Sequence, residues 1–114
     1  MNSNNFGPMQ IAIILLTLAT AIIHLSLGIP NGLVMFILNG IGYIVLVTAL
    51  YLPQFKTQRA LIRWGLIAFT AVTVIGWVLI GLREPIAYID KVIELALITL
   101  LIIEGRQASK PAMS

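Results

Sequence analysis

The most restrictive feature of the sequence is a series of long apolar stretches joined by very short polar connections. Each is close to the roughly 20 apolar residues that an α-helix needs to cross a bilayer core about 30 Å thick. They do not alternate, and they exceed the roughly 10 residues of a membrane β-strand. The sequence therefore predicts an all-α protein, an integral membrane bundle of four transmembrane helices. The expected helices span about residues 9–28, 33–52, 60–82 and 86–104.

The composition supports this class. Hydrophobic residues make up 60% of the 114 residues and charged residues only 10%, which leaves too little polar surface to cover a soluble domain. We expect one membrane domain over residues 9–104, preceded by a polar segment at 1–8 and followed by a disordered tail at 105–114. The absence of cysteine excludes disulfides, cysteine-ligated metal centres and thiol catalysis.

The connections contain residues that end helices. The first helix is expected to stop at Gly28, because the segment from Gly28 to Gly32 includes Pro30 and two glycines. The second helix is expected to end before Pro53. Tight turns of this kind predict that successive helices are antiparallel neighbours.

Basic residues predict the orientation. With four spans, one side of the membrane collects Lys56, Arg59, Arg63, Arg106 and Lys110, whereas the other side has Arg83 and Lys91. By the positive-inside rule, both termini then face the cytoplasm. The net charge of +3 contains no run of Lys or Arg, so it indicates orientation and no nucleic-acid partner. We expect a multi-pass protein of a prokaryotic cytoplasmic (inner) membrane.

Polar residues in the apolar stretches fall at a common depth. At 1.5 Å per residue, His24 and Asp90 lie about 6 Å, Asn39 about 9 Å and Glu94 about 12 Å below the outer ends of their helices. Asp90 and Glu94 share one helix face, and Lys91 can pair with Glu94 across three residues. Buried ionisable groups cost roughly 2.5–3.5 kcal/mol each in a membrane, so they should turn inward. We predict a polar pocket of His24, Asn39, Asp90, Lys91 and Glu94.

Two interpretations of this pocket remain open. It could hold a proton, a cation, or the head group of a quinone or lipid, and Glu94 could then carry protons. Alternatively, it is a buried hydrogen-bond network that fixes helix register. His24 could also be an axial ligand of haem or of a chlorophyll-type pigment, although one histidine cannot supply bis-histidine ligation. We predict no metal site and no resident cofactor.

Small residues predict close helix contacts. Gly40 and Gly42 follow directly after Asn39, and we expect a tight helix crossing there.

Several short motifs resemble those of small four-helix integral membrane proteins of unknown function from archaea and some bacteria. The motifs are His24-Leu25-x-x-Gly28, Leu38-Asn39-Gly40-x-Gly42-Tyr43, Leu50-Tyr51-x-Pro53 and Asp90-Lys91-x-x-Glu94. This resemblance implies four spans and no catalytic assignment.

Function is predicted mainly by exclusion. The chain has no nucleophile elbow, phosphate loop, metal-binding histidine pair or nucleotide fingerprint, so we do not expect an enzyme. The leading hypothesis is a non-catalytic accessory subunit of a larger membrane complex, such as a respiratory or photosynthetic electron-transfer complex. The second is a small oligomeric proton or cation transporter or channel that uses the polar layer. The third is a pigment- or haem-binding subunit. Expected partners are the lipid bilayer and other membrane subunits or further copies of the chain.

Overall fold

The computed structural model describes residues 7–81 and 83–108, which are almost entirely helical. They form four α-helices and one short 3₁₀ helix, so the all-α prediction is confirmed. The elements are α1 (Pro8–Asn31), α2 (Val34–Tyr51), η1 (Pro53–Gln58), α3 (Arg59–Ile80) and α4 (Pro85–Ala108).

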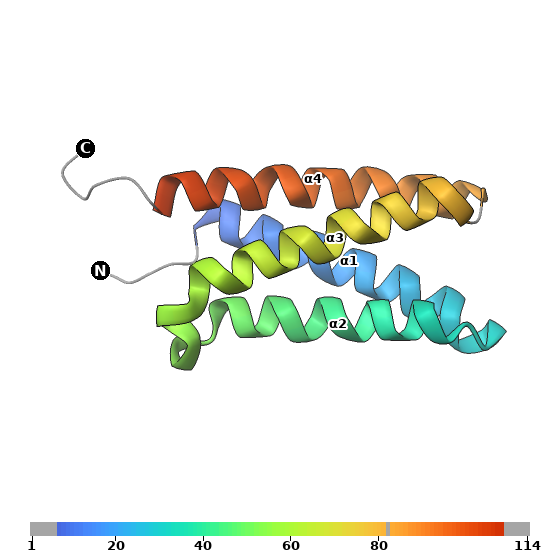
Figure 1. Cartoon of the computed structure of the whole chain (residues 1–114), viewed down its shortest axis with the longest axis horizontal. Coiled ribbons are helices and arrows are strands. Elements are labelled where there is room, and N and C mark those ends of the chain that lie inside the picture. Colours follow the sequence, from blue (N-terminus) through green and yellow to red (C-terminus); the bar gives the residue numbers. More distant parts are fainter. Residues whose placement is uncertain (1–6, 82, 109–114) are drawn as a thin grey trace.

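The four α-helices pack side by side in a ring. α1 packs on α2 and α4, and α3 packs on the same two helices, whereas the backbones of the described residues do not approach each other closely across the diagonals α1–α3 and α2–α4. Figure 1 shows that successive helices are antiparallel. The α1–α2 and α3–α4 turns lie at one end of the bundle, here named the turn end, and η1 lies at the other, the link end.

α1 continues beyond its predicted end. The prediction that it stops at Gly28 was wrong, because Pro30 lies within the last turn and the helix reaches Asn31. The ring of proline fixes a helical φ, and its missing N–H removes only one bond near the helix end. Gly32 then adopts a left-handed φ of 64°, and the amide of Leu33 donates to the Gly28 carbonyl at 2.9 Å. This glycine-terminated cap ends the helix.

The other helix ends differ from expectation by small amounts. α4 extends through Ala108, so residues 105–108, predicted as part of a disordered tail, are helical. α3 ends at Ile80, two residues before its predicted end. Residues 1–6, 82 and 109–114 lie outside the described residues, and with them most of the predicted polar segment and the rest of the predicted tail.

The two predicted packing glycines lie at close helix contacts. A Cβ atom at Gly40 would lie 2.6 Å from Leu25 Cγ and 3.0 Å from the Ala21 carbonyl oxygen of α1. A Cβ atom at Gly42 would lie 2.6 Å from the ring of Phe69 on α3. Only a residue without a side chain permits these approaches, so α2 sits tightly against both of its neighbours.

Three segments are long and apolar enough to cross a membrane: Pro8–Asn31, Val34–Tyr51 and Pro53–Ile80. α4 carries more charged residues than these, yet all of them except Arg106 in its last turn are buried. Asp90, Lys91, Glu94 and Glu104 are all buried. Large apolar side chains such as Val92 are exposed instead. The exposed face of α4 from Tyr88 to Ile103 is therefore mainly apolar.

An apolar layer fills the middle of the bundle. It separates polar groups near the turn end from polar groups near the link end. Its buried side chains are Ile13, Val47, Leu50, Leu66, Leu97 and Leu101. Thr17 and Thr70 also lie at this level, but each hydroxyl donates to a carbonyl of its own helix.

Candidate ion-binding site

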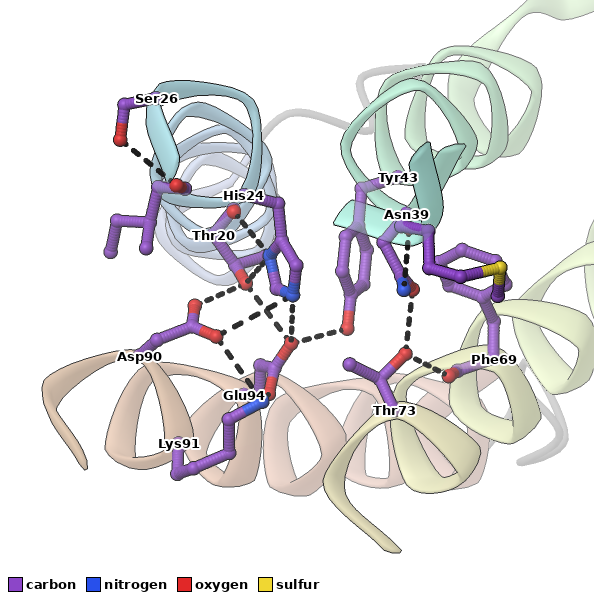
Figure 2. A network of polar contacts seen from close by, with 12 residues as sticks. Thr20, His24, Ser26, Asn39, Tyr43, Phe69, Thr73, Asp90, Lys91 and Glu94 are labelled. Carbon is purple, nitrogen blue, oxygen red and sulfur yellow. Dashed lines mark hydrogen bonds and ion pairs between the residues drawn. The ribbon is translucent and has the colours of Figure 1, made fainter. Parts of the chain in front are cut away.

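A cluster of buried polar side chains lies between α1, α2 and α4 near the turn end. Its members come from single helix faces, because Thr20 and His24, like Asp90 and Glu94, are spaced four residues apart. Every member is more than nine-tenths buried. Figure 2 shows that they point toward one another. This turn-end cluster consists of Thr20, His24, Tyr43, Asp90, Lys91 and Glu94.

Lys91 bridges the two acids. Its Nζ lies 2.5 Å from Glu94 Oε1 and 3.3 Å from Asp90 Oδ2. An isolated charge in a membrane interior is costly, and pairing offsets that cost. One ammonium group nevertheless balances only one of the two carboxylates.

Hydroxyl groups hold the remaining carboxylate oxygens. Tyr43 donates its hydroxyl to Glu94 Oε2 at 2.7 Å. The Thr20 hydroxyl contacts Asp90 Oδ1 and also lies 3.1 Å from Glu94 Oε2. Because a hydroxyl carries one proton, Thr20 can donate to only one of these acids at a time.

His24 is held in one orientation by its own helix. Nδ1 lies 2.8 Å from the Thr20 carbonyl oxygen. A carbonyl only accepts, so Nδ1 carries a proton and donates it. Nε2 is then the ring nitrogen that can gain or lose a proton. The rings of Phe36 and Tyr43 pack against the imidazole, with centroids 5.6 and 5.8 Å away.

Nε2 faces both acids without bonding to either. It lies 3.8 Å from Asp90 Oδ2 and 3.9 Å from Glu94 Oε2, which is too long for a hydrogen bond. Nε2 therefore has no hydrogen-bond partner within residues 7–81 and 83–108, although His24 is only 5% exposed. A flat tetrapyrrole has no room between Nε2 and two carboxylates, so this geometry does not favour the haem or pigment hypothesis.

The charges of the cluster do not cancel when His24 is neutral. With both acids ionised, Asp90 and Glu94 carry two negative charges and Lys91 one positive charge, which leaves a net charge of −1. Thr20 and Tyr43, the other groups that face the imidazole, are neutral. A net charge is unfavourable in a medium of low dielectric. The cluster therefore has a place for one further positive charge, next to Nε2.

A divalent metal fits this charge less well. His24, Asp90 and Glu94 each offer one ligand atom, and these atoms lie within 4.8 Å of one another. Imidazole and carboxylate donors suit several divalent ions. However, Lys91 is already bound to both acids, so a divalent ion would leave the cluster at +1.

A cavity of about 690 Å³ adjoins the cluster. His24, Asp90 and Lys91 form part of its wall, and most of the remaining wall is apolar. α3 supplies a long side of it, including Gly65 and Gly76, where a Cβ atom would meet no atom within 4 Å. The volume is within the range of about 300–1,000 Å³ that is usual for small-molecule sites.

Asn39 is the predicted pocket residue that does not join the cluster. Its side-chain oxygen accepts a hydrogen bond from the Thr73 hydroxyl at 2.9 Å, and its amide donates to the Met35 carbonyl at 3.1 Å. In Figure 2 no contact links this pair to His24 or Asp90, although Asn39 lines the same cavity. α2 and α4 are diagonal neighbours, and the short asparagine side chain does not reach across.

Two members of the cluster were not predicted. Thr20 lies four residues before His24, and Tyr43 lies four residues after Asn39, so the helical spacing contained a signal for both. The long side chain of Tyr43 crosses the diagonal to Glu94, where that of Asn39 does not.

A second polar cluster, with two buried and two half-buried members, lies at the link end and was also missed. Arg63 Nε donates to Glu104 Oε1 at 2.8 Å. The other carboxylate oxygen, Oε2, accepts from the Tyr51 hydroxyl at 2.7 Å and from Gln10 Nε2 at 3.0 Å. These four residues, one from each α-helix, form the link-end cluster. Its signal was an arginine and a glutamate inside apolar stretches, where each needs a partner.

No protein-family model, curated protein or solved structure matches the chain. The resemblance to small four-helix membrane proteins therefore stays a prediction. No residue role is carried over from a relative, and the chemistry of the turn-end cluster is the basis for assigning function.

Proposed function

We propose that the chain is a small membrane transporter whose turn-end cluster binds and exchanges one positive charge, a proton or a monovalent cation. The observation that supports it is the buried Nε2 of His24, which faces two carboxylates at 3.8 and 3.9 Å in a cluster with a net charge of −1. The imidazole is the side chain that ionises closest to neutral pH. Uptake of one proton at Nε2 brings the cluster to zero charge, and its release restores the negative charge.

The proposal includes four membrane-spanning helices in a prokaryotic cytoplasmic membrane, with both termini in the cytoplasm. α4 has 24 residues, as does α1, and at 1.5 Å per residue each is about 36 Å long. Its inward charges and apolar outer face support a fourth span. The link end carries Lys56, Arg59 and Arg106, while Arg83 lies at the turn end, and this asymmetry supports a cytoplasmic link end.

The apolar layer favours an exchanger over an open channel. Leu66, Leu97 and the other buried apolar side chains separate the two polar clusters, and the buried hydroxyls at this level, those of Thr17 and Thr70, donate to their own helices. A charge bound at the turn end would therefore cross only after a conformational change or through an interface between copies of the chain.

The accessory-subunit hypothesis stays a separate proposal. Broad apolar faces, such as those around Leu15 and Val92, can be covered by lipid or by other subunits. Mild detergent extraction followed by native purification tests it. The protein would be expected to elute with other membrane subunits, and a homogeneous particle that contains only this chain would contradict the hypothesis.

A liposome experiment tests the transport proposal. The purified protein is reconstituted with a pH-sensitive dye and K⁺ or Na⁺ inside the vesicles, and the outside is made acidic, so that proton entry can be exchanged for cation exit. The wild type should dissipate the gradient, and Glu94→Gln should not, because the neutral amide removes the negative charge that a proton balances. Glu84→Gln, the same change at an exposed acid outside the cluster, is the matched control. Equal flux in wild type and folded Glu94→Gln would refute the proposal.

Orientation is tested by chemical labelling. The chain has no cysteine, so a single Lys56→Cys substitution in η1 gives one reactive thiol. We expect this thiol to be protected in intact cells from a membrane-impermeant maleimide and labelled after lysis. Labelling in intact cells would show that η1 faces the outside of the cell, which is the opposite of the proposed orientation.

A further inference from the structure

The cavity beside the turn-end cluster indicates what the cluster exchanges for a proton. We propose that it binds a lipophilic organic monocation, whose charge replaces the proton next to Asp90 and Glu94. This inference rests on the proposed exchange function and adds a substrate class to it.

Charge selects the class. With His24 neutral the cluster carries −1, and Asp90 and His24 form part of the cavity wall. A monocation brings the sum to zero. An anion would take it to −2, a neutral molecule would leave it unbalanced, and a dication would take it to +1. Lys91 does not repel the ligand beyond this sum, because its charge is already paired with the acids at 2.5 and 3.3 Å.

The apolar wall selects an organic body. Phe36, Phe69 and Trp77 contribute aromatic side chains to the cavity. Aromatic faces attract cations, most strongly where water is excluded. The Arg83 guanidinium carbon lies 4.2 Å from the centroid of the Trp77 ring, so one face of Trp77 is already covered by a cation. Phe36 and Phe69 offer the ligand further aromatic surface. A bare metal ion would make no contact with most of this apolar wall.

The wall formed by α3 leaves space for that body. Gly65 and Gly76 both line the cavity, and a Cβ atom at either would meet no atom within 4 Å. By contrast, Gly40 and Gly42 are closed in by neighbouring helices. Two of the four glycines therefore serve packing, while the other two border open volume.

Exchange keeps the charge balanced. In the proton-loaded state Nε2 of His24 carries the proton and the cluster is neutral. When the monocation enters, that proton leaves Nε2 for solvent, and the organic cation takes its place as the balancing charge. No covalent bond forms or breaks other than N–H, and one proton is released for each cation bound.

The test uses two probes of the same shape and opposite charge, tetraphenylphosphonium and tetraphenylborate. Binding to the purified full-length chain is measured by titration calorimetry in buffers of different ionisation enthalpy, which counts released protons. We expect tetraphenylphosphonium to bind with release of one proton. Its affinity should therefore fall about tenfold for each unit by which the pH is lowered, in the range where His24 is protonated. Tetraphenylborate should not compete with it.

A cavity-filling variant separates this inference from the proposed function. Gly76→Leu places a side chain in open volume and favours the helix, because leucine is a better helix former than glycine. It should lower tetraphenylphosphonium affinity at least tenfold and leave the thermal unfolding curve of the purified protein close to that of the wild type. Val78→Phe, an enlargement at an exposed position of α3, should change neither.

The possible results are distinguishable. Wild-type proton flux combined with no tetraphenylphosphonium binding, with binding that releases no proton, or with equal binding in Gly76→Leu would overturn the substrate class and leave the exchanger in place. Absence of proton flux in both wild type and Glu94→Gln would overturn the proposed function itself.

Discussion

The two polar clusters both combine carboxylate, basic and tyrosine side chains, but they differ in how fully their hydrogen bonds and charges are paired. At the link end, one glutamate is paired with one arginine, and both carboxylate oxygens accept hydrogen bonds from Arg63, Tyr51 or Gln10. At the turn end, two acids share one lysine, and Nε2 of His24 has no hydrogen-bond partner among the described residues. The first cluster sums to zero charge, whereas the second needs one more positive charge.

The helices that build the clusters explain this difference. All four α-helices supply one side chain to the link-end cluster, which ties them together beside a smaller pocket of about 420 Å³. The turn-end cluster receives none from α3, whose glycines instead border the cavity. A complete polar network in a membrane bundle fixes helix positions. An incomplete network beside an open volume is suited to binding, because a ligand can supply the missing partner.

The largest expected effect is a difference between the clusters in how much a variant lowers the free energy of unfolding. Glu104→Ala should lower the free energy of unfolding by about 3–5 kcal/mol, because it leaves the buried Arg63 guanidinium without its partner. Glu94→Gln should change it by less than about 1 kcal/mol, since the amide oxygen still accepts from Tyr43 and the cluster charge moves from −1 to zero. Denaturation in detergent, followed by circular dichroism, measures both. Equal losses would mean that both clusters are structural.

The next effect concerns the net negative charge of the turn-end cluster. Lys91→Met takes the turn-end cluster to −2 with neutral His24, and a divalent ion would then balance it through the ligand atoms of His24, Asp90 and Glu94. We expect Mn²⁺ or Zn²⁺ to stabilise this variant by about 2.7 kcal/mol at a concentration one hundred times the Kd. Thermal unfolding with and without metal measures the effect.

Two controls accompany the lysine variant. The wild type should show no such stabilisation, and the double variant Lys91→Met with Glu94→Gln should lose it, because one negative charge has been removed. If metal stabilised the wild type and Lys91→Met equally, the positive charge of Lys91 would not be what disfavours a divalent ion in the wild type.

A matched pair of tyrosines compares the clusters at single hydroxyl groups. Tyr43→Phe and Tyr51→Phe each remove one donor to a buried glutamate, and each should cost about 1–2 kcal/mol of stability. Only Tyr43→Phe should change the pH profile of proton flux, because only Tyr43 contacts an acid of the exchange site. A changed profile in Tyr51→Phe with an unchanged one in Tyr43→Phe would reverse the roles assigned to the clusters.

The depth of the turn-end acids could be predicted from sequence because it depends only on helix direction and rise. His24, Asp90 and Glu94 meet because antiparallel helices with tight turns bring residues equally far from the same end to one level. Lateral neighbours are a different matter. No local sequence signal predicts which helices are neighbours around the ring, so the contact of Asn39 with Thr73 was not predicted.

The link-end cluster was missed for a related reason. Arg63 has the basic character of a topology signal, and Tyr51 lies where interfacial aromatic residues are common. Both properties hold without any contact to Glu104. Only the packing of α1, α2 and α3 against α4 shows that these side chains converge on one carboxylate. Similarly, the glycine cap at Gly32 allowed α1 to include Pro30, which sequence signals alone placed outside the helix.

The smallest expected effect tests where the turn-end cluster stops. Asn39→Leu removes the hydrogen bond from Thr73, which should cost about 0.6 kcal/mol, the average for hydrogen bonds between membrane helices. Proton flux should be unchanged, because Asn39 carries no charge and contacts none of the groups that balance the proton. Asp90→Asn, at the same level of the bundle, should abolish flux as Glu94→Gln does. If Asn39→Leu instead stopped proton flux while its unfolding curve stayed close to that of the wild type, the exchange site would have to include the Asn39–Thr73 pair, and the charge balance of the cluster would no longer be sufficient to explain it.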